Sequence, residues 1–506
     1  MKRNYALIVI MVLLPQFLLA QTFSDAFRMS YNQIQGTARA AGMGNAFGAL
    51  GGDFTSLSIN PAGSAVYQSS EFVITPNYYI NKSDITAGNS KFSDQDQGFA
   101  LNNVGAVGAF KTNRSEAGIV SINYGIGFNR LADYSSKGFA NFDNSSTSYL
   151  DDIVNYTTQE YQNNDPLTQS YLGQDIQNIQ YRDWPTKLAW DNYLINPAVD
   201  NQNNEIDGMY NNVLLPNETV NQRKTFSQSG HLDEYLFNLS LNFNHKFYLG
   251  STIGIHDMIY HNNTTYEELL PENSDFQYYN NYFMQGHGFN LKIGAIYRPI
   301  PEVRLGLAFH TPTFYQIDEE STLRMDSYLT WENTPNHKSY GTNIYNYDFN
   351  TPLKVVMSGA FVFAKKALVG VDAEYMDYVS MRFNNGGSGS DNFNDLNSVM
   401  DTYFKSVLNL RVGAELKLTD QFAIRGGYQS YGNPFKSNDL NQQATLTDNV
   451  SVISAGFGYT VNAFAINVAY TNSVSNISDG NEQPNYYQLA RQNNSQNVLV
   501  TLGFRF

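Results

Sequence analysis

The sequence has no cysteine among its 506 residues, and it is poor in charge. The lack of cysteine excludes disulfides, thiol nucleophiles, thiolate metal sites and a lipid-modified cysteine after a signal peptide. Charged residues make up 15% of the chain, and the formal net charge is −15. Because nucleic acids are held by basic surfaces, we expect no nucleic-acid partner.

The sequence also lacks an apolar run long enough for a transmembrane helix, which needs roughly 20 residues. Its most apolar run, residues 6–14, follows Lys2 and Arg3 and comes shortly before the small residue Ala20. A positive start, a short apolar run and a small residue are the parts of a secretory signal. We therefore predict that residues 1–20 are a signal peptide and that the chain is exported.

Aromatic residues are abundant, and apolar residues often alternate with small or polar ones, as in residues 120–128 (VSINYGIGF). A strand with one face in lipid and the other in a barrel lumen has this period of two. Fourteen segments fit the pattern, near 70–82, 100–111, 117–130, 234–245, 250–260, 286–298, 302–311, 351–363, 367–379, 404–418, 421–430, 450–460, 463–472 and 496–506. We predict an all-β fold, a 14-stranded antiparallel transmembrane β-barrel over residues 70–506.

The links between these segments alternate in length. After every second strand the link is a short turn, and after the others it is long, polar and rich in Asn. A barrel with periplasmic turns and extracellular loops has this alternation, whereas a soluble β-sandwich has no reason for it. We predict a large extracellular loop at 131–233. Tyrosines near the expected strand ends should form aromatic girdles at the membrane surfaces, namely Tyr78, Tyr79, Tyr134, Tyr248, Tyr260, Tyr297, Tyr403 and Tyr431.

Residues 21–69 precede the first strand and do not have its pattern. Phe27, Tyr31 and Ile34 share one face of a short helical segment, and a stretch rich in Gly and Ala follows. Gly42, Gly44 and Gly48 do not have the spacing of a dinucleotide-binding loop. We predict that residues 21–69 form a compact plug, or hatch, inside the barrel lumen.

Taken together, these features resemble the FadL/TodX-type family of outer-membrane transporters for long-chain fatty acids and other hydrophobic compounds. The resemblance rests on the Gly/Ala-rich hatch that ends in Asn60-Pro61-Ala62, on the fourteen strands, and on the hairpin LRVGAELKLTDQFAIRGGYQSYGNP at 410–434. It covers nearly the whole mature chain. It implies passive, ligand-gated uptake of long-chain fatty acids or aromatic hydrocarbons across the outer membrane of a Gram-negative bacterium.

The resemblance also implies where the gate lies. The hatch at Asn60, Pro61, Ala62 and Gly63 would shift, and the substrate would leave sideways through a kink in the third strand. Gly125 and Gly127 lie in that strand, and glycine is common at bends. The alternative is that these glycines make room for the plug.

Several charged residues should face the lumen by the same alternation. They are Asp372, Glu374, Arg411, Glu415 and Arg425. Glu415 and Arg425 should pair across the turn between them, and Arg411 and Arg425 are candidates for binding a substrate carboxylate. The alternative is a structural network of salt bridges between wall and plug.

Other functions remain open at this stage. The same scaffold would suit a structural or protein-secretion-associated barrel, and haemin uptake is a further alternative. The seven histidines have no metal-type spacing and no GxSxG motif stands out, so we expect no metal, no cofactor and no enzyme activity. Expected partners are a hydrophobic small molecule, outer-membrane lipid and the barrel-assembly machinery, which would meet the last strand ending at Phe506.

Overall fold

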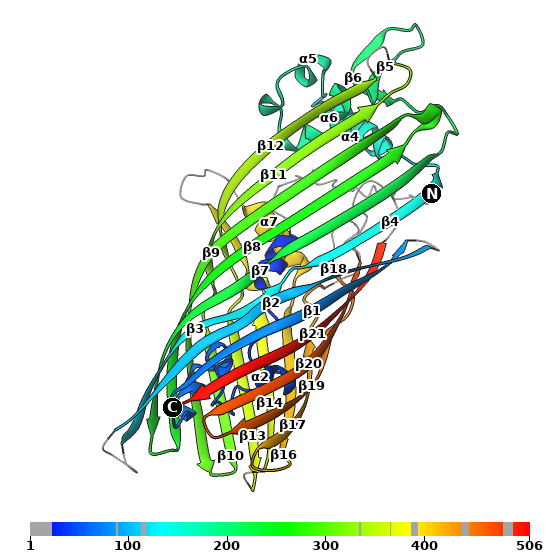
Figure 1. Cartoon of the computed structure of the whole chain (residues 1–506). Coiled ribbons are helices and arrows are strands. Elements are labelled where there is room, and N and C mark those ends of the chain that lie inside the picture. Colours follow the sequence, from blue (N-terminus) through cyan, green and yellow to red (C-terminus); the bar gives the residue numbers. More distant parts are fainter. Residues whose placement is uncertain are drawn as a thin grey trace, which may run out of the picture.

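A single antiparallel sheet closes on itself to form a barrel in the computed structural model (Figure 1). The structure describes residues 23–87, 90–112, 118–332, 335–364, 366–385, 393–436, 445–478 and 489–506. The predicted signal peptide lies outside these ranges. The first and last strands pair from Glu71↔Arg505 to Ala87↔Leu489, which closes the barrel.

The prediction of a 14-stranded antiparallel barrel is confirmed, because each of the fourteen predicted segments falls on a wall strand. Five wall strands consist of two successive pieces, β3 with β4, β10 with β11, β12 with β13, β14 with β15, and β18 with β19. The wall elements are β1 (Glu71–Ala87), β2 (Ser90–Lys111), β3 (Ile119–Asp133), β4 (Ser136–Ser145), β7 (Val220–Phe243), β8 (Phe247–Leu269), β9 (Asp275–Ile300), β10 (Val303–His310), β11 (Phe314–Tyr328), β12 (Asn336–Asn350), β13 (Lys354–Phe363), β14 (Ala367–Asp377), β15 (Arg382–Asn385), β16 (Ser406–Lys417), β17 (Phe422–Tyr431), β18 (Thr445–Leu446), β19 (Val450–Val461), β20 (Phe464–Ser478) and β21 (Leu489–Arg505).

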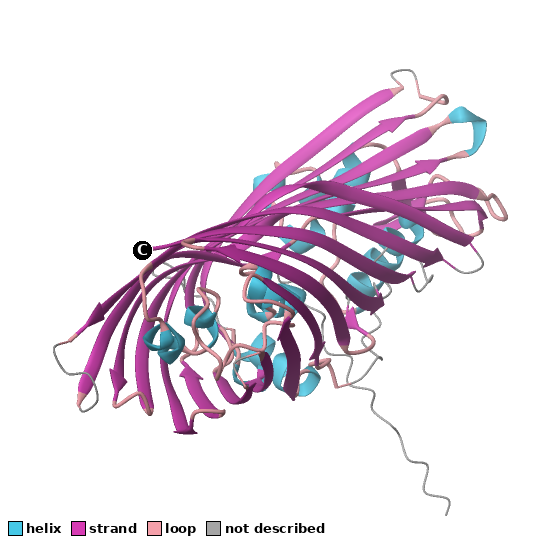
Figure 2. Cartoon of the chain, turned by 60° about the horizontal axis from the view of Figure 1, so that its bottom comes forward, coloured by secondary structure: helices cyan, strands magenta, loops and turns pink. Residues whose placement is uncertain are grey.

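The helices are short and lie in three places. Inside the lumen are α1 (Phe23–Ser30), α2 (Ala38–Gly42), α3 (Ser56–Ile59) and η1 (Pro61–Val66), which Figure 2 shows within the ring of strands. Beyond the barrel are α4 (Tyr149–Gln162), α5 (Gln169–Leu172), η2 (Ile176–Asn178), η3 (Tyr181–Asp183) and α6 (Trp184–Asp191), with the hairpin β5 (Ile195–Val199) and β6 (Glu205–Asn212). In the links are η4 (Pro271–Asn273), η5 (Tyr378–Ser380) and α7 (Asn394–Tyr403). No helix in the described ranges is long and apolar enough to cross a membrane.

Large apolar side chains are exposed on the outside of the barrel in a continuous band. Ile122, Tyr124 and Ile126 on β3 are examples, and similar residues are exposed on the neighbouring strands. The band covers the half of the barrel near the short turns. Phe99 and Leu101 on β2 and Phe314 on β11 mark its outer edge. Since an outward apolar band about 25 Å tall is the mark of a transmembrane barrel, this half spans the membrane.

The strands continue well beyond the band, so the prediction of a long link after every odd-numbered strand was wrong. β1 and β2 stay paired up to Ala87↔Ser90, and β8 and β9 stay paired up to Leu269↔Asp275. Above the membrane the outer face of the strands is largely polar, whereas apolar residues such as Phe276, Leu323 and Met325 lie on the inner face. The outward hydrophobic alternation therefore disappears although the backbone ladder continues. Figure 1 shows these tall strands rising on the β7–β12 side of the barrel.

Beyond the membrane-spanning half, the tall strands carry a folded subdomain, residues 146–219, within the predicted loop. Its extracellular position stays a prediction. The side chain of Ser148 accepts a hydrogen bond from the backbone N–H of Leu150, and Asp151 reaches back to the N–H of Ser148, so a capping box starts α4. Leu150 and Trp184 then join a buried cluster with Phe276 of β9. The subdomain therefore packs on the inner face of the tall wall.

Candidate functional site

Residues 37–67 fill the lower lumen and are held to the wall by many hydrogen bonds; we call them the plug. The backbone N–H of Ala38 donates to the Thr501 hydroxyl at 2.7 Å, and that of Gly48 donates to the Asp372 carboxylate at 3.0 Å. Farther along, the Ser58 hydroxyl donates to Glu234 at 2.6 Å. These bonds reach strands on all sides of the barrel.

Asn60, Pro61, Ala62 and Gly63 lie at the centre of the plug. The Asn60 side chain caps η1 by accepting from the N–H of Ala62, and its amide donates to Gly48 O at 2.7 Å and to Ala295 O at 3.2 Å. Asn60 thereby joins two parts of the plug to the wall. Gly63 packs inside the plug, where its carbonyl accepts from the N–H of Gly52 at 2.9 Å.

Glycines in the wall allow the plug to come this close. A Cβ at Gly294 would lie 1.9 Å from Asn60 Oδ1, and a Cβ at Gly250 would lie 2.4 Å from the carbonyl carbon of Pro61. Four more wall glycines face the plug backbone in the same way, namely Gly306, Gly370, Gly413 and Gly427. The sequence alone does not identify these positions, because their partners are distant in the chain.

Above the plug, α1 is held mainly by side-chain packing. Phe27 and Tyr31 pack against a buried cluster that includes Tyr378, Phe404 and Phe435. On its other side Arg28 lies 3.9 Å from the ring centre of Tyr260. The helix thus sits among aromatic side chains rather than in a net of backbone hydrogen bonds.

Many of the expected girdle tyrosines line this lumenal region instead, so their prediction was wrong. Tyr248, Tyr260 and Tyr431 are buried and face inward, whereas Tyr297 is exposed on the outside. The sequence places them near strand ends, but only the register decides which face they occupy.

Glu319 on β11, above the apolar band, accepts from the hydroxyl of Tyr282 at 2.7 Å, and burial together with the nearby Asp25 raises the pKa of its carboxyl.

Among the described residues, the wall is discontinuous between β2 and β4. In the ranges that the structure describes, β2 pairs with β3 only from Asn103↔Asn129 to Lys111↔Ser121, and its outer part, 90–102, has no ladder with β4. Side chains bridge the two strands: Lys137 pairs with Asp96 at 2.7 Å, and the rings of Phe92 and Phe139 lie 5.4 Å apart. We call this boundary the β2–β4 seam.

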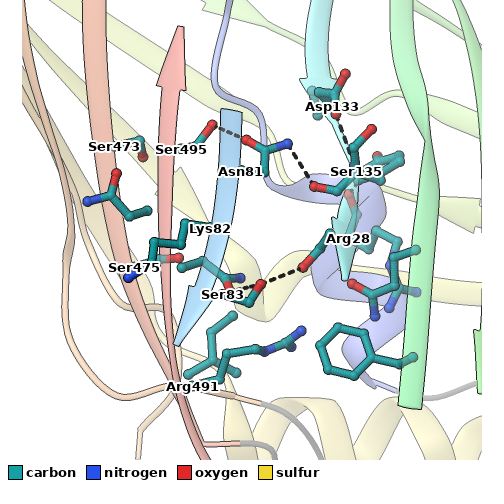
Figure 3. A pocket seen from close by; sticks show the side chains of 18 of the residues that line it. Arg28, Asn81, Lys82, Ser83, Asp133, Ser135, Ser473, Ser475, Arg491 and Ser495 are labelled. Carbon is teal, nitrogen blue, oxygen red and sulfur yellow. Dashed lines mark hydrogen bonds between the residues drawn. The ribbon is translucent and has the colours of Figure 1, made fainter. Parts of the chain in front are cut away.

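The seam forms because the chain turns inward between β3 and β4. The Asn81 amide of β1 donates to the carbonyl of Ser135 at 2.8 Å, and the hydroxyls of Ser83 and Ser136 lie 3.2 Å apart (Figure 3). Since β2 lies between β1 and β3 in the wall, these contacts place residues 135–136 over the lumen. The seam starts beside Leu101, at the outer edge of the apolar band.

The segment after α1 covers the freed edge of β3. The backbone N–H of Gln33 donates to the carbonyl of Leu131 at 2.9 Å, and that of Gln35 donates to the carbonyl of Arg130 at 3.0 Å. Arg130 itself pairs with Asp233 at 2.9 Å. The N-terminal segment and the seam are therefore in direct contact.

Gly125 and Gly127 lie below the seam, where the β2–β3 ladder is unbroken. A Cβ at Gly125 would lie 2.3 Å from Leu57 Cδ2, and one at Gly127 would lie 2.2 Å from Val104 O and 2.7 Å from the Phe54 ring. These contacts support the interpretation that both glycines make room for the plug. Their role in a lateral opening stays a prediction.

A cavity of about 370 Å³ lies between α1 and the seam. Phe27 and Tyr31 form one side, and Phe139 and Ala140 of β4 form another. Figure 3 shows the strands β1 and β21 with Asn81, Ser83, Arg491 and Ser495 turned toward it. Sequence reasoning missed most of these residues because they lie on strand extensions that were expected to be loops.

The predicted inward charges are buried in the lumen, and the expected pair is confirmed. Arg425 Nε donates to Glu415 at 2.6 Å, and Arg39 of the plug donates to the same carboxylate at 3.0 Å. Arg411 Nη2 donates to Glu374 at 2.5 Å. Both predicted carboxylate-binding arginines thus already hold a carboxylate of the protein, so these contacts support the structural network.

The fold and the lumenal site define the class of protein: a membrane-spanning β-barrel with an internal plug and a cavity above it. It matches a FadL homologue of Pseudomonas aeruginosa at 14% identity and a TM-score of 0.51, over 94% of this chain and 99% of that chain. It also matches a deletion mutant of TodX, a monoaromatic hydrocarbon channel, at 11% identity and a TM-score of 0.50, over 94% and 99%. At these identities the likeness is one of fold, and the chain has the barrel fold of the FadL homologue and of TodX. No family model and no curated protein matches the sequence.

Proposed function

We propose that this chain takes up hydrophobic compounds, long-chain fatty acids or aromatic hydrocarbons, across the outer membrane of a Gram-negative bacterium without an energy source. The observation that carries the proposal is the cavity that α1 and residues 31–35 line on one side and the β2–β4 seam borders on another, with the plug filling the lumen below. A solute in this cavity lies close to the membrane at the seam, whereas the plug blocks its passage down the lumen. One of the two structural neighbours, TodX, is a monoaromatic hydrocarbon channel.

The physical argument concerns the route of an apolar solute. Passing through a water-filled pore would expose its surface at about 25 cal/mol per Å². A seam that starts at the outer edge of the apolar band lets the solute enter lipid without that cost. Opening the seam breaks no backbone ladder. It separates Asp96 from Lys137 and Phe92 from Phe139.

For the gate we propose movement of α1 and residues 31–35 rather than of Asn60–Gly63. The plug is held by hydrogen bonds to strands around the barrel, whereas α1 is held by aromatic packing and borders the cavity. Release of the Gln33 and Gln35 bonds would uncover the edge of β3. A ligand that displaces Phe27 and Tyr31 would thus reach the seam.

Cross-linking the seam tests the proposed route, and the absence of native cysteine makes it specific. The variant Asp96→Cys/Lys137→Cys, joined by a reducible bis-thiol reagent, should lose uptake of labelled oleate or toluene and regain it on reduction. The control Arg223→Cys/Glu267→Cys spans a continuous ladder between β7 and β8 and should keep uptake. Undiminished uptake with the seam linked would reject the lateral route. A protein that co-purifies in place of any ligand would support the secretion-associated alternative.

A further inference from the structure

A row of asparagines crosses the inner wall from the cavity to the base of the seam. It runs over four neighbouring strands, from Asn497 on β21 through Asn77 on β1 and Asn103 on β2 to Asn129 on β3. Asn497 lines the cavity. Asn129 donates to the Ser58 hydroxyl of the plug at 2.7 Å. The row therefore connects the cavity, the plug and the seam.

Two hydrogen bonds fix the orientation of the amides in this row. The Asn77 amide donates to Asn497 Oδ1 at 2.8 Å, and the Asn103 amide donates to Asn129 Oδ1 at 2.6 Å. The oxygens of Asn77 and Asn103 are thus fixed as acceptors, and both are buried without a partner in the described structure. The chain of hydrogen bonds stops between these two residues.

Asn102 lies at this interruption. β2 has one extra residue there, because Thr75 pairs with Asn103 and Pro76 pairs with Leu101. The Asn102 side chain is fully buried, and neither its oxygen nor its nitrogen has a partner among the described residues. Four polar atoms without partners in the described structure therefore lie on the neighbouring strands β1 and β2, near the end of the β2–β3 ladder. Buried polar atoms are nearly always hydrogen-bonded, so such a group calls for an explanation, and a ligand that supplies the missing partners is one.

The chemistry of these atoms selects the kind of ligand that would satisfy them. Three are amide oxygens, which accept hydrogen bonds, and one is an amide nitrogen. A fourth buried oxygen, of Asn262 in the cavity wall, also has no partner. Hydroxyl and amide N–H groups donate to such oxygens, whereas a carboxylate only accepts and a hydrocarbon does neither.

We propose that the transported compound is an uncharged amphiphile whose head carries hydrogen-bond donors, such as hydroxyl or amide N–H groups, and that the asparagine row is its track to the seam. This inference rests on the proposed uptake of hydrophobic compounds through the seam, and it names an uncharged amphiphile as the substrate in place of a fatty acid or a hydrocarbon. The closed seam leaves the amides unsatisfied, and a passing head restores their hydrogen bonds as its chain enters the membrane. A bare hydrocarbon gains nothing from them.

Competition binding by native mass spectrometry tests the proposal on the full-length barrel in detergent. The probes are monoolein, oleate and an unsubstituted alkene of similar chain length. Wild type should bind monoolein at least tenfold more tightly than the alkene, and Asn102→Leu should reduce that preference at least threefold. Asn280→Leu, which replaces another asparagine with an unpartnered buried oxygen far from the row, should keep it.

A second readout separates binding from folding. Asn102→Leu removes two unsatisfied polar atoms, so the barrel should unfold at the same or a higher temperature than wild type. Equal binding of all three probes, or a preference for oleate, would overturn the inference and leave the proposed function standing. Failure of every probe to bind would instead reject the proposed function itself.

Discussion

At the scale of single residues, the wall glycines opposite the plug determine whether the plug can seat. We expect Gly294→Ala to destabilise the barrel by about 1–3 kcal/mol, because its Cβ would overlap the Asn60 amide. Gly359→Ala is the matched control, since nothing lies within 4 Å of a Cβ there. The temperature at which the folded barrel stops migrating as a compact band in detergent gels measures the effect. Equal shifts in the two variants would contradict the fit between wall and plug.

Arg411 separates the structural role of a lumenal charge from a substrate role. Arg411→Ala leaves the buried Glu374 without its cation, and breaking such a pair costs about 3–5 kcal/mol. The double variant Arg411→Met/Glu374→Gln should recover part of this stability, because neither partner of this ion pair is then left buried without the other. Oleate affinity measured in the stable double variant should equal that of wild type. A tenfold loss of affinity there would assign carboxylate binding to Arg411.

The sequence predicted the direction of a side chain correctly where the in–out alternation along a strand determines it. Alternation placed Asp372, Glu374 and Arg411 in the lumen, and the tight turn placed Glu415 opposite Arg425. It could not find Arg39 as the second partner of Glu415, because that contact joins residues far apart in the sequence. For the same reason it missed the asparagine row, which only the register of four strands assembles.

At the scale of elements, α4 provides a pH-dependent contribution to stability. Burial, and secondly the neighbouring Asp151, raises the pKa of Asp152 to about 6. A carboxyl whose pKa is raised by folding stabilises the folded state below its unfolded pKa, and this contribution is lost as the pH rises through the folded value. The subdomain should therefore lose stability between about pH 4 and pH 6.

Asp152→Asn should remove this dependence and stabilise the subdomain at pH 7.5 by about 1 kcal/mol, a value reduced for partial solvent screening. Tryptophan fluorescence is a specific probe, because the three tryptophans, Trp184, Trp190 and Trp331, all lie beyond the membrane-spanning half. Thermal unfolding followed at pH 5 and pH 7.5 gives the comparison. A variant with the same pH dependence as wild type would contradict this role of Asp152.

Elements were predictable from the sequence inside the membrane and much less so outside it. Within the apolar band one face of each strand meets lipid, so the period of two is strong and all fourteen strands could be found. Above it the tall strands have no apolar outer face, and sequences such as SKFSDQDQG at 90–98 do not indicate a strand, although β2 includes them. The seam was not predictable either, since it depends on the inward turn of the backbone at 135–136.

At the scale of the whole molecule, we expect the plug to keep its place in the lumen when α1 is removed. The hydrogen bonds from the plug to the wall begin at Ala38, so a variant lacking residues 23–35 should still assemble with a closed lower lumen, although Asn45 loses its bond to the carbonyl of Ile34. It would lose the bonds from Gln33 and Gln35 to the edge of β3, along with one side of the cavity. We therefore expect faster uptake of a hydrophobic probe without a large increase in ion conductance.

The matched control for this deletion is a variant that lacks residues 23–67, which removes the plug as well and should open a conducting pore. Planar-bilayer recording and uptake by whole cells are measured on both. If the shorter deletion conducts as well as the longer one, α1 holds the plug in place and the two move together as one gate. If it conducts little but takes up the probe faster, the lateral route works with the plug fixed. The barrel then keeps its barrier to polar solutes while it opens to apolar ones, because the two routes leave the cavity in different directions.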